Sequence, residues 1–107
     1  MTQFSDREKA FENKFKSDQE FAFKVQARRN KLLGLWAAQQ MGIDGASAES
    51  YAKEVVTSDF EEVGDDDVLQ KVLADLTGKG VDISEHGLRV EMDKLMSVAR
   101  TQFMEEE

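Results

Sequence analysis

Apolar residues recur at intervals of three and four along most of the chain, which is the period of amphipathic α-helices. Four segments carry this pattern, and residues that commonly cap helices (glycine, serine or aspartate) flank them. These segments are residues 18–41, 48–62, 67–78 and 85–104. Four amphipathic helices with short loops predict an all-α protein, a four-helix bundle. The chain contains no proline, which agrees with an almost entirely helical structure.

The spacing also predicts helix ends and a core. Gly42 is expected to end the first long helix in a left-handed conformation, and Ser47 and Ser84 are expected to cap the second and fourth helices. Val81 and Ile83 are expected to hold the last connection against the core. The inward residues of the helices are predicted to be Phe21, Val25, Leu32, Leu35 and Trp36; Tyr51, Ala52, Val55 and Val56; Leu69, Val72, Leu73 and Leu76; Leu88, Met92, Leu95, Met96, Ala99 and Phe103.

A separate short helix is predicted ahead of the bundle. Ser5 is followed three residues later by Glu8, which is the spacing of a capping box. The same spacing recurs from Ser17, so a second helix start is predicted there. Residues 1–17 are therefore expected to form an N-terminal helical arm, and residues 18–107 the bundle.

Phe4, Phe11 and Phe15 are spaced by seven and four, which places them on one helical face of the arm. An aromatic stripe of this kind suits a groove on another protein. Ordering twelve residues costs roughly 12–24 kcal/mol of backbone entropy, whereas three buried phenylalanines contribute about 5–9 kcal/mol, so the arm is expected to be mobile alone. Two alternatives stay open. The arm packs on the bundle as a fifth helix, or it continues into the next helix, because the stripe keeps its phase as far as Trp36.

The net charge of −8 is unevenly distributed. Residues 21–43 contain four basic residues and no acidic one, whereas residues 44–67 are strongly acidic. The overall sign argues against a nucleic-acid-binding protein, which needs a basic face. The basic residues are Lys24, Arg28, Arg29 and Lys31. Arg28 and Arg29 are predicted to bind a partner, and the alternative is that the basic face is solvated or pairs within the chain.

The sequence offers little for catalysis. It has no cysteine, and its single histidine, His86, is expected to be a surface or cap residue. The acidic cluster from Glu61 to Asp67 lacks the spacing of a calcium-binding loop and is expected to be a solvated turn. No enzyme activity, cofactor or metal site is therefore predicted, although a small enzyme that uses this cluster and a metal remains an alternative. No signal peptide or membrane-spanning run is evident, which predicts a cytoplasmic protein without direct membrane insertion.

Four blocks of the chain resemble a known family. They are residues 6–15 (DREKAFENKF), 27–38 (ARRNKLLGLWAA), 51–56 (YAKEVV) and 64–69 (GDDDVL). In this order they are similar to the zeta subunit of bacterial F-type ATP synthases, the ATPase-inhibitor subunit of the alphaproteobacterial type. The resemblance covers essentially the whole chain.

The resemblance implies an inhibitor of the F1 ATPase. In the family, a mobile N-terminal segment precedes a four-helix bundle, inserts at a catalytic interface between α and β subunits and blocks rotation in the hydrolysis direction. It implies that Phe4, Phe11 and Phe15 are groove anchors, while Arg7, Lys9 and Lys14 pair with acidic groups of the F1 subunits or the central shaft. It also implies a location at the inner membrane through the ATP synthase. The alternative is a helical adaptor whose arm docks on another cytoplasmic protein.

Overall fold

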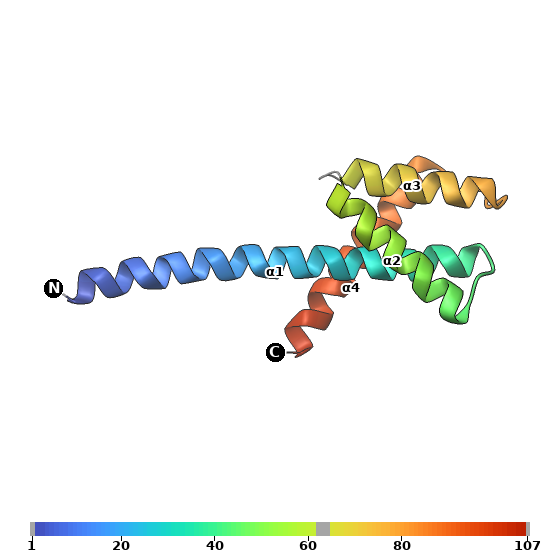
Figure 1. The fold of residues 1–107 in the computed structure, drawn as a ribbon. Coiled ribbons are helices and arrows are strands. Elements are labelled where there is room, and N and C mark those ends of the chain that lie inside the picture. The colour runs from blue at the N-terminus through green and yellow to red at the C-terminus, as the bar shows by residue number, and fades with distance from the viewer. Residues whose placement is uncertain (1, 62–64, 107) are drawn as a thin grey trace.

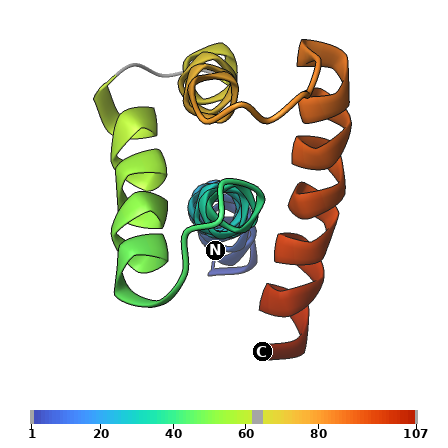
Figure 2. The same ribbon diagram turned by 90° about the vertical axis from the view of Figure 1, so that its right-hand side faces the viewer.

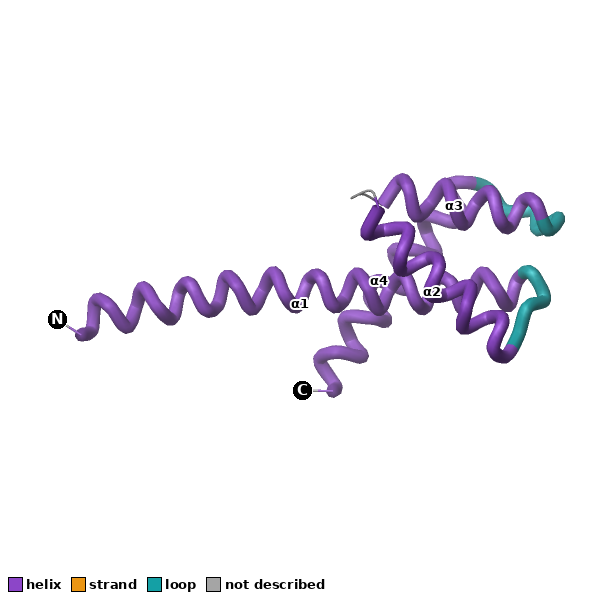
Figure 3. Tube along the Cα trace, viewed as in Figure 1, coloured by secondary structure: helices purple, strands orange, loops and turns teal. Residues whose placement is uncertain are grey.

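The computed structural model describes the backbone of residues 2–61 and 65–106 and the side chains of residues 19–58 and 65–105. The described chain contains four helices and no strand, as predicted (Figures 1 and 3). They are α1 (Thr2–Gln40), α2 (Gly45–Glu61), α3 (Asp65–Gly78) and α4 (Glu85–Glu106).

Helix α1 is the centre of the bundle and not one of four equivalent helices. Viewed along α1, α2 and α4 cross it on opposite sides, and α3 runs alongside it on a third side (Figure 2). Among the described elements, no helix covers the fourth side of α1. The protein measures 65 × 25 × 22 Å, and the long dimension follows α1, whose N-terminal part projects beyond the other helices (Figure 1).

The predicted separate helix over residues 5–16 is not present, because α1 runs without interruption through Ser17. The continuous alternative is the one observed. The physical reason is the shared phase of the two segments, which lets one helix carry both without rotating either apolar stripe. Capping residues bind the free N–H groups at the start of a helix, but they do not prevent a helix from continuing through them.

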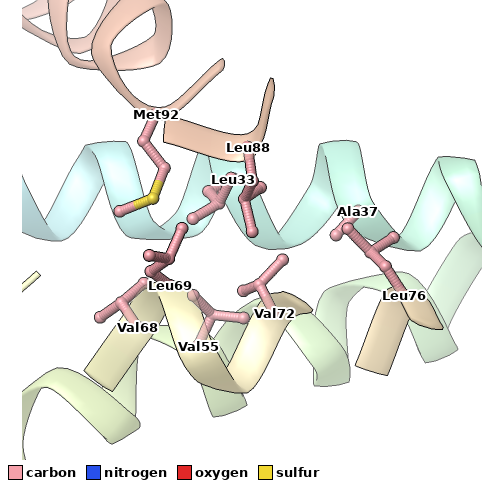
Figure 4. Close-up of a cluster of buried hydrophobic side chains, with 9 residues drawn as sticks. All are labelled: Leu33, Ala37, Val55, Val68, Leu69, Val72, Leu76, Leu88 and Met92. Atoms are coloured by element: carbon pink, nitrogen blue, oxygen red, sulfur yellow. The ribbon is translucent and has the colours of Figure 1, made fainter. Parts of the chain in front are cut away.

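The core lies where the three shorter helices meet α1 (Figure 4). It differs from the prediction on α1, because Leu33 is fully buried, whereas Leu32, Leu35 and Trp36 are only half-buried. A helix surrounded on three sides buries a wider arc than the single stripe that periodicity defines. The buried cluster consists of Leu33, Ala37, Val55, Val68, Leu69, Val72, Leu76, Leu88 and Met92.

Most predicted helix ends are confirmed. Gly42 has a φ of 76°, the left-handed conformation expected after α1. Ser84 Oγ accepts a hydrogen bond of 3.0 Å from the backbone N–H of Gly87, so it caps α4. The start of α2 was predicted wrongly, because the helix begins at Gly45 and contains Ser47.

The connection before α4 also agrees with the prediction. Val81 and Ile83 are half-buried and pack against the core cluster. They hold the last loop in place and so fix where α4 begins relative to α1.

Candidate partner-binding surface

The N-terminal part of α1 is the most prominent candidate surface. Residues 2–20 rise about 28 Å at 1.5 Å per residue, and they stand clear of the other three helices in Figure 1. Among the described side chains, Phe21 marks the level at which α1 meets the bundle. Its ring packs edge-on against Phe103 of α4, with the centroids 6.3 Å apart.

All six residues predicted to act from the arm belong to this projecting stretch of backbone. They are Phe4, Arg7, Lys9, Phe11, Lys14 and Phe15. Their side chains lie outside the described residues, so their contacts and their division into anchors and charges stay predictions. The helical backbone places Phe4, Phe11 and Phe15 at spacings that share one face.

The structure uses Arg29 inside the protein, and its predicted contact with a partner stays a prediction. Its exposed fraction is only 1%. Its Nε donates a hydrogen bond of 2.8 Å to Oδ1 of Asn30, and its Nη2 donates one of 2.8 Å to Oδ1 of Asp65 at the start of α3. A buried guanidinium needs such partners, because an unpaired buried charge is strongly destabilising. The alternative of pairing within the chain is therefore the one observed.

Arg28 is also engaged within the chain. Its Nη1 donates a hydrogen bond of 2.9 Å to Oε1 of Gln102, and its guanidinium carbon lies 4.4 Å from the centroid of the Phe103 ring. This cation–π geometry joins α1 to the last turns of α4. Arg28 and Phe21 thus hold the base of the arm against α4, and the predicted partner contact of Arg28 competes with these interactions.

Among the described side chains of α1, from residue 19 onward, the exposed basic residues are instead Lys24 and Lys31. The sequence placed both in the acid-free segment but gave no reason to choose them over the arginines. The signal that separates the two pairs is position on the helix. Arg29 faces α3 and Arg28 faces α4, whereas the lysines lie on the uncovered side.

A polar network joins α2 to α3. The Tyr51 hydroxyl donates a hydrogen bond of 2.7 Å to Oδ2 of Asp75, and Lys71 Nζ lies 3.3 Å from the same oxygen. Lys71 also forms an ion pair of 3.7 Å with Glu54. Burial raises the pKa of the Tyr51 phenol well above its usual value, and the hydrogen bond and negative charge of Asp75 raise it further.

Two of the aspartates that begin α3 form ion pairs within the chain. Asp65 binds Arg29, and Asp66 accepts a hydrogen bond of 2.8 Å from Nη2 of Arg89 in α4. The hydrogen bonds to Asp66 and Glu85 raise the pKa of Arg89 above its usual value. Asp66 and Arg89 are both exposed, so this pair contributes little to stability.

The described residues hold no group of three or more histidine, cysteine or acidic side chains arranged for a metal ion. The side chains of Glu61 and Glu62, part of the predicted acidic cluster, lie outside the described residues. His86 is exposed in the first turn of α4. Over the described part of the chain, no helix combines the length and the apolar character that a membrane span requires.

Comparison with solved structures shows a close relative. A protein whose structure was determined in solution by NMR is 50% identical to this chain, with a TM-score of 0.70. The match covers 79% of this chain and 96% of that one. A comparison with curated proteins gave no match.

The fold and the projecting helix define a small all-α protein that presents the end of one helix away from its bundle. The family model for ATPase inhibitor subunit zeta matches residues 1–102. The chain belongs to this family, whose members are inhibitor subunits of an ATPase.

Proposed function

We propose that this protein inhibits the F1 sector of ATP synthase by inserting the N-terminal part of α1 at a catalytic interface between α and β subunits. The observation that carries the proposal is the continuous α1, which extends beyond the bundle by several turns (Figure 1). A preformed helix that stands clear of its own core is available to a groove on another protein. Filling an interface that must change shape during rotation stops the hydrolysis cycle.

Within this proposal the arm residues divide by chemistry. Phe4, Phe11 and Phe15 are the anchors, because each buried phenylalanine contributes about 1.5–3 kcal/mol. The charged residues of the arm, Arg7, Lys9 and Lys14, pair with acidic groups of the F1 subunits or of the central shaft. Arg28 and Arg29 also bind within the bundle, so their predicted contact with F1 competes with these interactions.

The bundle acts as the body that carries the arm and is not itself catalytic. Five of its described acidic groups, Glu54, Asp65, Asp66, Asp75 and Glu85, form ion pairs with basic ones, and no cofactor is needed for a steric block. Binding to F1 places the protein at the inner membrane through the ATP synthase, in the cytoplasm.

The test is ATP hydrolysis by purified F1, followed while the full-length protein is added. The parent protein is expected to inhibit, and a variant that lacks residues 1–16 is expected to be inactive. The matched control is the thermal unfolding of both proteins. The two melting temperatures are expected to agree closely, because Val25 is the first buried apolar residue among the described side chains and lies after the deleted segment.

Two outcomes contradict the proposal. Absence of inhibition by the parent protein, with recovery of a different cytoplasmic partner by affinity capture, points to the helical adaptor. A large loss of melting temperature on deletion shows that the arm is packed on the bundle as an additional core element.

A further inference from the structure

Contacts with the three surrounding helices fix the orientation of α1. Gly34 faces α2, because a Cβ atom there would touch Ala52 and Val55. Arg29 faces α3 through Asp65, and Arg28 faces α4 through Gln102. These three directions leave one side of α1 uncovered, as the view along the helix shows (Figure 2).

Lys24 and Lys31 lie on this uncovered side. Lys31 follows Arg29 by two residues, which is about 200° around a helix of 3.6 residues per turn, so it points away from α3. Lys24 precedes Lys31 by seven residues, which returns to the same side about 10 Å further along the axis. Both side chains are exposed, and neither forms an ion pair with any side chain that the structure describes.

The charge of this side differs from that of the rest of the protein. Residues 21–43 contain no acidic residue, although the whole chain has a net charge of −8. The basic groups that form described ion pairs are Arg29, Lys71 and Arg89, and their acidic partners lie on α2, α3 and α4. The uncovered side of α1 is thus a local positive stripe, here called the lysine stripe (Lys24 and Lys31), on an acidic protein.

We propose that the lysine stripe is a second contact, which docks on an acidic surface of the inhibited partner beside the groove that receives the arm. This inference rests on the proposed function, because one continuous helix carries both the arm and the stripe. Charge complementarity selects the occupant: an acidic protein surface repels the acidic bundle and attracts the stripe, as it attracts the basic residues of the arm. The stripe therefore sets the rotation of α1 about its axis as the arm enters, and it accelerates correct encounter.

The experiment compares inhibition time courses of F1 at low and high ionic strength. The test variant carries Lys24→Glu and Lys31→Glu. The matched control carries Lys53→Glu and Lys79→Glu, an identical change in net charge at two other exposed lysines. A third variant, Lys24→Arg with Lys31→Arg, keeps the positive charge. All four substituted positions are exposed, so equal melting temperatures are expected.

The test variant is expected to associate at least about fivefold more slowly than the parent at low salt, and the difference is expected to shrink at high salt because exposed charges are screened. The control and the arginine variant are expected to associate nearly as fast as the parent. If the parent inhibits and the test variant associates as fast as the parent, the proposal about the stripe is wrong and the proposed function is unaffected. If the control associates as slowly as the test variant, the effect comes from net charge alone, and the proposal about the stripe is again wrong. If the parent does not inhibit, both proposals fall together.

Discussion

Gly34 of α1 and Ala52 of α2 meet at a point where the two helices touch through their backbones. A Cβ atom at Gly34 would lie 2.6 Å from the Cα atom of Ala52 and 3.2 Å from its Cβ atom. Real Cβ atoms do not approach other atoms so closely, so only glycine permits this crossing distance. The contact fixes α2 against the same helix that carries the projecting arm.

The Gly34→Ala substitution is therefore expected to destabilise the protein. At a solvent-exposed helix position alanine stabilises the helix by about 1 kcal/mol relative to glycine. Overpacking a close contact, however, typically costs about 1–3 kcal/mol or more. The clash is with backbone, which cannot rotate away, so a net loss of at least about 1 kcal/mol is expected in urea unfolding. Gly78→Ala is the matched control, because nothing lies within 4 Å of a Cβ atom there. A variant Gly34→Ala as stable as the parent contradicts the close crossing.

Replacement of Tyr51 by phenylalanine is expected to change how stability depends on pH. The raised pKa of Tyr51 means that the folded protein keeps the phenol proton above pH about 10, where the unfolded chain loses it. The unfolded state then binds fewer protons, so the free energy of unfolding falls as pH rises through this range. Tyr51→Phe is expected to remove that part of the alkaline loss, and to cost about 1 kcal/mol at neutral pH through the lost hydrogen bond to Asp75.

The measurement for this prediction is urea unfolding of parent and variant from neutral to alkaline pH. Tyr51 is the only tyrosine, so the ultraviolet absorbance of the tyrosinate ion reports its titration directly. Ionisation near the usual pKa while the protein is still folded would show that the phenol is not protected.

The pair between Asp65 and Arg29 is expected to matter more than the neighbouring pair between Asp66 and Arg89. Asp65→Ala removes a charged hydrogen-bond partner from a buried guanidinium and is expected to cost about 1–3 kcal/mol. Asp66→Ala removes a partner from an exposed arginine and is expected to cost less than about 1 kcal/mol. Chemical unfolding of the two variants compares them directly. Equal stability of both variants would show that water replaces Asp65 at Arg29.

Within the arm, aromatic and charged residues are expected to act on different rates. Phe11→Ala or Phe15→Ala is expected to weaken inhibition by at least about 1–2 kcal/mol, mainly through faster dissociation. Lys9→Ala or Lys14→Ala is expected to slow association, with an effect that diminishes as salt is raised. Phe4 precedes the Ser5 capping position, so it is expected to contribute less than the other two phenylalanines.

Inhibition time courses for these variants at two ionic strengths separate the two effects. If both phenylalanine variants inhibit as well as the parent, the aromatic stripe is not the binding face. Recognition by the arm then depends on its charges.

Local sequence signals were sufficient for the four helices of the bundle and for several of their ends, but they also predicted a separate helix over residues 5–16 that belongs to α1. Ser84 and Gly42 could be predicted because capping depends on residues next to one another in the sequence. The burial of Leu33 and Arg29 could not be, because it depends on three other helices surrounding α1. Periodicity reports one apolar stripe and cannot reveal how many neighbours a helix has.

The candidate site shows the same division. The aromatic spacing indicated an arm ahead of the bundle, and α1 does project there. The partner contacts of Arg28 and Arg29 stay predictions, but their binding to Gln102 and Asp65 within the chain could not be predicted, because these partners are distant in sequence. The residues next to an arginine on a mostly polar helix do not indicate that its partner lies far away in the sequence.

The hydrogen bond between Arg28 and Gln102 joins positions separated by 74 residues, which has a consequence for biosynthesis. A chain emerges from the ribosome N-terminus first at about 5–20 residues per second, so α1 is synthesised seconds before α4, which packs against it. The absence of proline removes slow isomerisation from the docking of α4 onto α1. Docking of α4 is thus a late event, and a truncation before Gln102 leaves the arm attached to an open, incomplete body.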